Sequence, residues 1–334
     1  MRTLVTVIFA GFAFVFVDAA ELSKTMPIQD YKITTGLEPL PKSQAYPYNR
    51  DLITDSPGIE LGWTYLDYQS NGSTGNRAAV CDDGSRYFCW MGILGWPYPP
   101  APRGVFYYWL SPDGSEYNAG QIGSQGSAHP QLDIIYGDQG AIAFTQPETW
   151  VTLVIDSNPP GMGFFDYYDP PGQYWPHIAV DRNDNVHLLT YQFTDQYSLD
   201  LAYTRSTDSG NTWTELETID SVMVIGGVID ASPVSDRVVI AYPKASDTTT
   251  QWWNDIVYVV SEDGITWDFE NGQVNVTDYA NDDDSLWAYT DLDVIIDYED
   301  NIHIIWNAQW VTDEGFITGH SCFITMSRPN RLIP

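Results

Sequence analysis

A turn motif recurs along this chain and constrains its fold more than any other feature. The full copy, Ser206–Trp213, reads S-x-D-x-G-x-T-W. Shorter copies occur at Ser261–Trp267 and at Ser111–Tyr117, where tyrosine replaces the final tryptophan. A turn motif that repeats along a sequence is typical of a repeat architecture, because each copy marks the same point of one structural unit.

Five segments are predicted to be β-hairpins. Each has an apolar, β-branched run, a turn containing Asp, Asn, Ser or Gly, and a second apolar run. His177–Leu189 and Asp293–Ile305 match each other best, and the weaker copies are Arg77–Trp90, Leu132–Thr145 and Ile229–Tyr242. Helical periodicity is hard to find anywhere in the chain, so an all-β fold is favoured.

A third apolar run follows each hairpin, as at Leu201–Arg205 and Ile256–Val260. The motif turns come directly after such runs. We expect a fourth strand to begin at the aromatic residue of the turn, giving Trp213–Ile219 and Trp267–Glu270. Because four antiparallel strands make one propeller blade, the sequence predicts an all-β β-propeller of four-stranded antiparallel blades.

The number of hairpins predicts about five blades. The last unit lacks a fourth strand, since its third strand near Cys322–Met326 is followed by Pro329 and then by the end of the chain. An open blade leaves an exposed strand edge. The stretch Ile59–Tyr68 alternates well enough to supply the missing outer strand, which would close a five-bladed ring. The alternative is that the chain is a fragment of a propeller with six or more blades.

The N-terminal residues 1–20 are predicted to be a signal peptide. Met1–Thr3 gives a positive start, Leu4–Val17 is an apolar run of secretory length, and small residues follow for cleavage. An uncleaved membrane anchor is the alternative. Residues 21–57 form a Pro-rich arm without sustained periodicity, and residues 58–334 form the propeller. We therefore expect a secreted or cell-surface protein.

The chain is strongly acidic, with 45 Asp and Glu residues against 14 Lys and Arg, and a net charge of -31. Such a surface repels the phosphate backbone of nucleic acids, so nucleic acid is excluded as a partner. No apolar stretch beyond the signal peptide approaches membrane length, and no membrane span is expected after its cleavage.

Three cysteines, Cys81, Cys89 and Cys322, leave at least one thiol free. If Asp83-Gly84 is a two-residue turn, Cys81 lies opposite Arg86 and Cys89 opposite Ala78, which argues against a disulfide between these two cysteines. A bridge from either one to Cys322 stays open. No C-x-x-C pair is present, so a structural zinc site is not expected.

The S-x-D-x-G-x-T-W turn resembles the Asp-box, or BNR repeat, of sialidases and related propellers, especially those of exported bacterial proteins. The residues that carry the resemblance are Ser206, Asp208, Gly210, Trp213, Asp263, Trp267 and Asp113. It covers about residues 59–327 and implies a sialidase-like propeller. In such a turn the Asp carboxylate accepts backbone N–H groups, the glycine adopts a positive φ, and the aromatic ring packs between sheets. These residues are expected to be structural rather than catalytic.

Sialidase activity itself is not favoured by the residues present. A sialidase holds its substrate carboxylate with several arginines, and this chain has few beyond the predicted signal peptide. The family's F/Y-R-I-P element is absent near the start, and Arg331–Pro334 resembles it only weakly, at the wrong end. We expect a non-catalytic surface that binds carbohydrate or a surface protein. The alternative is an exo-sialidase-like glycoside hydrolase that uses carboxylates at the rim of the central channel.

The starts of the inner strands are predicted to face one rim of that channel and to form the ligand site. The candidate residues combine a cation, imidazoles, an indole and carboxylates: Arg77, His129, Trp175, His177, Asp230, Asp291 and Asp293. Such a set could bind a sugar, hold a metal ion or perform acid–base hydrolysis. The alternative is that these are ordinary strand starts, and no catalytic residue is assigned.

Other features have structural alternatives as well. His187 and His303 occupy equivalent places in two hairpins, which favours packing. Asp282–Asp284 and Asp181–Asn185 are rich in oxygen ligands, so Ca²⁺ is possible as a cofactor, although neither has EF-hand spacing and solvated turns are the alternative. Trp96–Tyr98 and Gln251–Trp253 could stack on sugars or pack between blades.

Overall fold

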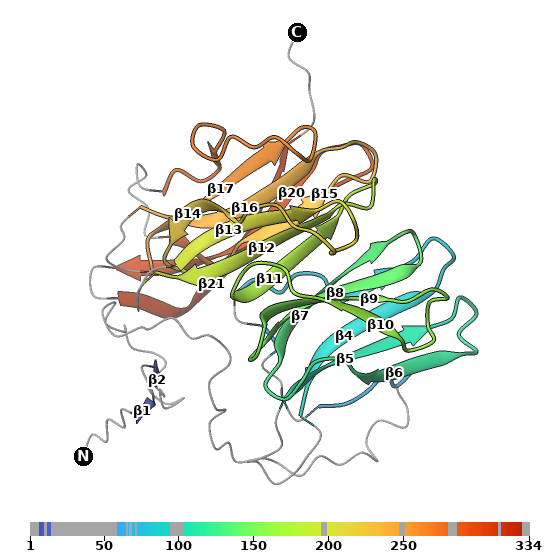
Figure 1. Cartoon of the computed structure of the whole chain (residues 1–334). Helices are drawn as coiled ribbons and strands as arrows, with labels where there is room; N and C mark the ends of the chain where they lie inside the picture. The colour runs from blue at the N-terminus through green and yellow to red at the C-terminus, as the bar shows by residue number, and fades with distance from the viewer. Residues whose placement is uncertain are drawn as a thin grey trace.

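The computed structural model describes residues 59–64, 66, 69–70, 72–93, 103–194, 199–246, 251–279, 286–312 and 315–328, and the backbone of two short paired strands, β1 (Val7–Phe9) and β2 (Phe12–Phe14). The rest of the predicted signal peptide and arm, Trp96–Tyr98 and Asp282–Asp284 lie outside the described residues. All secondary-structure elements of the described part are β-strands (Figure 1). It contains no helix long and apolar enough to cross a membrane.

Besides β1 and β2, the described part forms three four-stranded antiparallel sheets and one seven-stranded sheet, in which β15 to β18 make a fourth four-stranded unit joined to β19 through β17; we number these units blades 1 to 4 (Figure 1). Blade 1 contains β3 (Ala78–Val80), β4 (Arg86–Gly92), β5 (Gly104–Leu110) and β6 (Tyr117–Gln121). Blade 2 contains β7 (Ala128–Ile135), β8 (Gln139–Gln146), β9 (Trp150–Asp156) and β10 (Phe165–Tyr168). Blade 3 contains β11 (Tyr174–Val180), β12 (Val186–Phe193), β13 (Leu199–Ser206) and β14 (Glu217–Val222). Blade 4 contains β15 (Val228–Ala231), β16 (Val238–Ala245), β17 (Asn254–Ser261) and β18 (Val274–Asn275).

The first strand of each blade contacts the first strand of the next, which places these strands at the inside of a propeller ring. The contacts run from β3 to β7, from β7 to β11 and from β11 to β15. β15 in turn contacts β19 (Leu286–Ile296), which pairs with β20 (Ile302–Thr312), and β20 pairs with β21 (Gly315–Arg328). The five predicted hairpins are therefore confirmed as antiparallel pairs, and the β-propeller class is confirmed with four complete blades.

The stretch Ile59–Tyr68, predicted to complete the last unit as an outer strand, contacts blade 1 in its described residues. Residues 59–64 belong to no strand, and in the described part β21 pairs only with β20. Thr64 Oγ1 accepts the Ile93 N–H at 3.1 Å, and the Leu66 side chain packs in a cluster with Met91, Ile93 and Ala128. Alternation alone could not reveal which sheet this segment covers, because it fits the end of any blade.

In blade 1 the fourth strand begins at the aromatic Tyr117, as predicted, but in blades 3 and 4 it begins later, because the turns before it continue past the aromatic residue. In blade 3 the Thr214 N–H still bonds Arg205 O at 2.9 Å, and β14 begins only at Glu217. In blade 4 the Gly272 N–H donates to Asp268 O at 2.9 Å, so the residues after Trp267 form another turn and the strand is reduced to Val274–Asn275. Trp213–Ile219 and Trp267–Glu270 are therefore wrong as strand boundaries.

The three S-x-D turns lie between the third and fourth strands and are held by their Asp carboxylates. Asp208 accepts the Thr212 N–H and the Thr212 hydroxyl, both at 2.7 Å, and Gly210 has a φ of 88°. Asp263 accepts N–H bonds from Ile265 and Thr266. Asp113 accepts the N–H and the hydroxyl of Ser115. These hydrogen bonds favour the ionised carboxylate and lower the pKa of all three aspartates.

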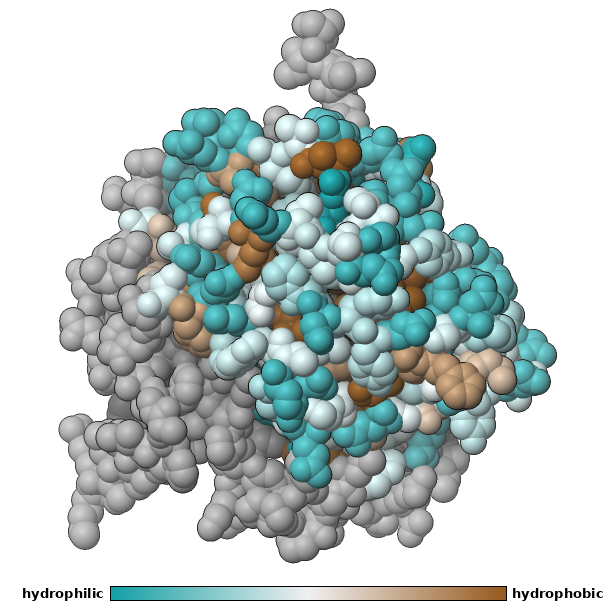
Figure 2. All heavy atoms as spheres, viewed as in Figure 1, coloured by the Kyte–Doolittle hydropathy of each residue, from teal (hydrophilic) through white to brown (hydrophobic). Residues whose placement is uncertain are grey.

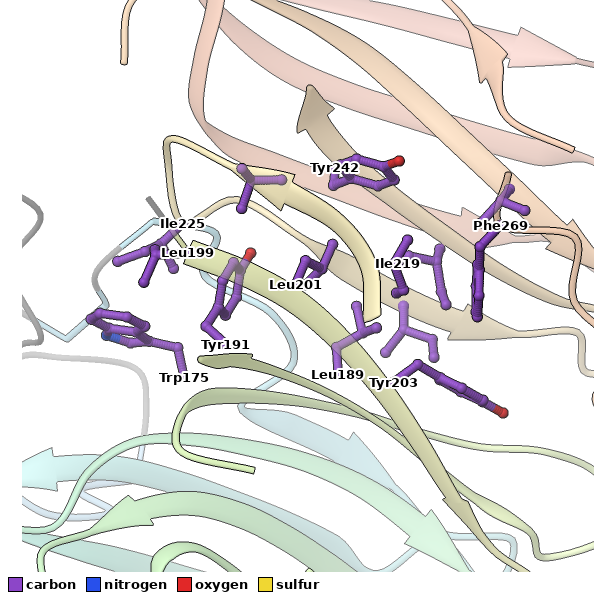
Figure 3. Packing of buried hydrophobic residues seen from close by; sticks show 14 of the residues in the cluster. Trp175, Leu189, Tyr191, Leu199, Leu201, Tyr203, Ile219, Ile225, Tyr242 and Phe269 are labelled. Atoms are coloured by element: carbon purple, nitrogen blue, oxygen red, sulfur yellow. The ribbon is translucent and has the colours of Figure 1, made fainter. Parts of the chain in front are cut away.

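The largest apolar cluster lies between blades 3 and 4 and joins them. Leu189 and Leu201 from blade 3, both labelled in Figure 3, belong to one buried cluster with Ile240 and Val257 from blade 4. Trp213 packs as a partly buried ring against the cluster between blades 2 and 3. The face in Figure 2 is mainly polar, with scattered apolar side chains. Burial between blades is thus the main force holding the ring together.

The first hairpin corrects the predicted cysteine register. The Cys81 N–H bonds Ser85 O, so the turn has three central residues, and the Cys89 N–H bonds Arg77 O instead of lying opposite Ala78. Cys81 and Cys89 are both buried free thiols, so neither is bridged. Burial, the largest cause, raises the pKa of Cys81 to about 11 and that of Cys89 to about 12. Both therefore stay protonated and unreactive at neutral pH.

Candidate functional site

Two of the predicted rim residues, His129 and Trp175, occupy the same irregular position in neighbouring blades. Each precedes a proline at the start of an inner strand, and the strand pairing shifts register there, between Ala128 and Gln131 in β7 and between Tyr174 and His177 in β11. His129 has a φ of 55° and Trp175 a φ of 46°. Proline cannot donate to the ladder, which explains the bulge. Left-handed backbone at bulky residues is strained, and such strain gathers at functional sites.

Trp175 and His129 belong to a continuous set of rings that we call the rim aromatic strip: Trp150, Tyr174, Phe193, Trp175 and His129. The ring centroids of Trp150 and Tyr174 are 5.1 Å apart, as are those of Tyr174 and Phe193. Trp175 lies 5.4 Å from Tyr174 and 6.4 Å from His129. Trp175 also packs edge-on against Tyr191, and both are labelled in Figure 3.

The strip meets solvent at its outer end. Trp150 is 44% exposed and has a φ of 67°, whereas Trp175 and His129 are 2% and 3% exposed. The two predicted residues are therefore supports in the interior, and the exposed ring is one that the sequence did not single out. Trp150 follows a Pro-Glu-Thr turn and begins β9, so nothing in the sequence distinguishes it from an ordinary strand start.

Among the described residues, Gln69 is the one that holds Arg77. Its guanidinium donates to the side-chain Oε1 of Gln69 at 3.3 Å and also to the Gln69 carbonyl. Gln69 Oε1 in turn accepts the Met91 N–H at 2.8 Å, which fixes the arrangement to blade 1. Burial lowers the pKa of Arg77, as expected for a cation surrounded by protein. Its donor groups are therefore partly used by Gln69, which is neutral.

His177 is brought next to Arg77 and is kept neutral. The side chain is 5% exposed. Burial, with a further contribution from the nearby Arg77 charge, lowers the pKa of His177 to about 3. A neutral imidazole at this place does not change charge between pH 5 and 8, so it is not a pH switch.

Asp230 does not lie at the start of its strand as predicted. It is the third residue of the four in β15, and its Oδ2 accepts the Ile296 N–H of β19 at 2.6 Å. Asp133 in β7 makes the equivalent contact between blades 2 and 3, because its Oδ2 accepts the Val180 N–H of β11 at 2.6 Å. Burial raises the pKa of Asp133 to about 6 and that of Asp230 to about 7. These two carboxyls therefore join neighbouring inner strands, β7 to β11 and β15 to β19, by hydrogen bonds.

Asp291 lies in the irregular part of β19, where the register shifts between Ala288 and Leu292, and Asp293 follows in the regularly paired part, opposite Ile305. Both are exposed. The surrounding protein nevertheless raises the pKa of each through desolvation. The Asn307 amide fixes Asp291 by donating to its Oδ2 at 2.7 Å. Burial is the main cause that raises the pKa of Asp230, and the Asp133 and Asp293 charges raise it further.

His187 and His303 are structural, as predicted from their equivalence. His187 Nε2 lies 3.2 Å from Asp181 Oδ2, and His303 Nε2 lies 2.7 Å from Asp297 Oδ2. The Asp181 carboxylate also accepts three hydrogen bonds from its own turn, two from N–H groups and one from the Asn185 side-chain amide. Both carboxylate oxygens of Asp181 are therefore hydrogen-bonded within the protein. In the described part of the chain no group of three or more His, Cys, Asp or Glu residues could hold a metal ion.

Trp252 packs inside the protein instead of offering a sugar platform. It is 1% exposed and stacks on Tyr289, with ring centroids 5.1 Å apart and an interplanar angle of 18°. The packing alternative is therefore the one observed for this residue.

No family model matches the chain, and no curated protein matches it in sequence. Its fold is similar to that of the polysaccharide lyase Uly1, with 10% identity over 86% of this chain and 74% of that chain and a TM-score of 0.52. It is also similar to a PL25 ulvan lyase, with 12% identity, 77% and 72% coverage and a TM-score of 0.50. At these identities the likeness concerns the β-propeller fold alone.

Proposed function

We propose that this chain is a secreted carbohydrate-binding β-propeller and that its ligand lies against the rim aromatic strip. The observation that carries the proposal is the exposed Trp150 ring, which packs edge-on against Tyr174, and Tyr174 packs in turn against Phe193. An aromatic face held rigidly in this way suits the C–H face of a sugar, because it buries apolar area without ordering a flexible side chain. Two polysaccharide lyases share the fold, which supports carbohydrate as the ligand class.

Neutral sugars fit the charges of this region better than acidic ones. The rim cation Arg77 is committed to Gln69, and His177 is neutral. Asp291 and Asp293 are exposed carboxyls. Sugar hydroxyls can donate to such carboxylates, whereas a sialic or uronic acid would bring a like charge beside them. The acidic character of the whole chain adds to this repulsion.

Glycoside hydrolysis is the second candidate function. The observation in its favour is the raised pKa of Asp230, about 7, close to the raised Asp293. A carboxyl that stays protonated near neutral pH beside a second carboxyl is the pair that a glycosidase uses as acid and base. Against it, Asp230 Oδ2 is occupied by the Ile296 N–H. Binding without turnover is therefore preferred.

A glycan array with a parallel hydrolysis assay tests both functions. We expect the purified chain to bind neutral oligosaccharides, to ignore their sialylated and uronic counterparts, and to release no reducing ends. If reducing ends are released by the wild type and not by Asp293→Asn, the function is hydrolysis and not binding alone. No binding across a broad panel would overturn the carbohydrate assignment and leave a surface protein as the partner.

We further infer that the S-x-D turns are Asp-box repeats and that β19 to β21 form a fifth blade. The shared carboxylate-to-N–H pattern of Asp208, Asp263 and Asp113 supports the first inference. Contacts between β15 and β19 at the inside of the ring support the second. Secretion rests on the apolar N-terminal run, and N-terminal sequencing of the exported protein tests it.

A further inference from the structure

A groove between blades 3 and 4 shares no residue with the rim aromatic strip. It encloses about 540 Å³ between the outer strand β14 and the turn that follows Trp267. A volume of this size is typical of small-molecule sites. Its lining includes the polar and aromatic residues Glu217, Asp220, Lys244, Trp267, Glu270 and Gln273.

A fixed polar network forms one side of the groove. Lys244 Nζ donates to Gln273 Oε1 at 2.6 Å and pairs with Asp220 Oδ2 at 3.0 Å. The Tyr242 hydroxyl donates to the same Asp220 oxygen at 3.0 Å, and Gln273 Nε2 donates to the Phe269 carbonyl at 2.7 Å. Each group of the network is therefore oriented before any ligand arrives, which lowers the entropy cost of binding.

The network still faces solvent. The Lys244 side chain is 42% exposed and that of Asp220 is 22% exposed. An ammonium has three donors and a carboxylate several acceptor positions, so both retain hydrogen-bonding capacity after the contacts above. A ligand that carries adjacent donors and acceptors could use both groups at once.

Aromatic side chains, Trp267 and Phe269, also line the groove. Trp267 stacks on Phe269 with ring centroids 5.2 Å apart and meets Tyr203 edge-on at 5.1 Å. These contacts fix the indole plane while leaving the residue partly exposed in the groove. An aromatic wall beside planar amide and carboxylate groups combines apolar contact with directional hydrogen bonds.

We propose that this groove is a second ligand site, for a single neutral sugar unit. Vicinal hydroxyls of a sugar would donate to Asp220 and accept from Lys244, while a C–H face packs on Trp267. Glu217 and Glu270 lie exposed at the groove and give it a negative balance. That balance excludes uronic and sialic acids. Two sites on one chain would raise avidity for a polysaccharide.

The test uses the full chain with methyl glycosides of glucose, galactose, mannose, xylose and arabinose, and with glucuronic acid as the anionic counterpart. Saturation-transfer NMR identifies the binders, and titration gives their affinities. We expect at least one neutral glycoside to bind and glucuronic acid to fail. Thr218→Trp, which fills the groove from the exposed face of β14, should lower that affinity at least tenfold, and Glu270→Gln should lower it less.

Glu215→Gln is the matched control, since Glu215 is an exposed carboxylate just outside the lining. It should leave the affinity unchanged. Trp150→Asn at the rim should also leave groove binding intact, which separates this proposal from the rim site. The groove proposal is overturned if no neutral glycoside binds, or if the binding survives both Thr218→Trp and Glu270→Gln. Circular dichroism of each variant shows that a lost affinity does not come from a lost fold.

Discussion

Replacing Asp230 by asparagine should stabilise the protein at neutral pH. Asp230 is surrounded by protein in the inner ring, and its contact with β19 is a single N–H bond. Asparagine Oδ1 can accept the same N–H bond and carries no charge. The substitution therefore removes the cost of burying the ionised carboxylate and keeps the hydrogen bond.

The magnitude follows from the pKa of Asp230, which burial raises from 3.8 to about 7. Between these values the folded chain binds more protons than the unfolded chain, so stability falls as the pH rises through this window. At 1.36 kcal/mol per pKa unit the full loss above about pH 7 is at most roughly 4 kcal/mol. Asp230→Asn should recover this loss, raising the Tm by on the order of 5 °C at about pH 8 and very little at about pH 4.

Thermal melts of Asp230→Asn and wild type at both pH values measure the effect. Glu215→Gln removes the same formal charge at an exposed position and corrects for the general acidity of the chain. The reasoning is refuted if Asp230→Asn lowers the Tm at about pH 8, or if its effect equals that of Glu215→Gln. A lowered Tm would mean that the ionised carboxylate stabilises the ring, and an effect equal to that of the control would mean that burial of Asp230 carries no cost of its own.

Three further predictions concern the blades. Tyr87→Phe removes the 2.5 Å hydrogen bond from Tyr87 to Asp156 between blades 1 and 2, and should cost about 1–3 kcal/mol in denaturant unfolding; an unchanged midpoint would contradict this. Gly210→Ala places a Cβ at a φ of 88° and should cost roughly 1–2 kcal/mol, so a neutral result in the same assay would show that the turn can relax. Cys81 and Cys89, buried and protonated, should resist a thiol reagent at neutral pH until the protein unfolds, and peptide mapping that finds them labelled in the native state would disprove their burial.

The sequence predicted the repeat unit well, because strand periodicity and turn residues are local signals. The hairpins at His177–Leu189 and Asp293–Ile305 pair as expected, and the S-x-D turns follow the third strands. The starts of the outer strands in blades 3 and 4 were missed. The outer strand after Trp213 begins late because Thr214 still bonds Arg205, a contact that no local pattern encodes.

The candidate site was only partly predictable. The X-Pro starts of two inner strands mark His129 and Trp175 in the sequence, but their burial depends on how neighbouring blades pack. The exposed member of the strip, Trp150, is the first residue of β9 and carries no motif. Asp133 was missed although a lone carboxylate in an apolar strand was the available signal.

The affinity of the rim for a neutral glycan tests the central claim most directly. Isothermal titration should compare wild type with Trp150→Asn, which removes the ring but tolerates the φ of 67°, and with Trp150→Phe, which keeps an aromatic face. Tyr136→Asn is the control, because Tyr136 is an aromatic that is 53% exposed and has a φ of 56° in a hairpin turn at the other end of β7.

The ligand for this titration is the best neutral oligosaccharide from the array. We predict that Trp150→Asn weakens its binding at least tenfold, equivalent to about 1.4 kcal/mol. Trp150→Phe should retain most of the affinity, and Tyr136→Asn all of it. Equal affinities for wild type and Trp150→Asn would contradict the assignment of the rim aromatic strip as the carbohydrate site.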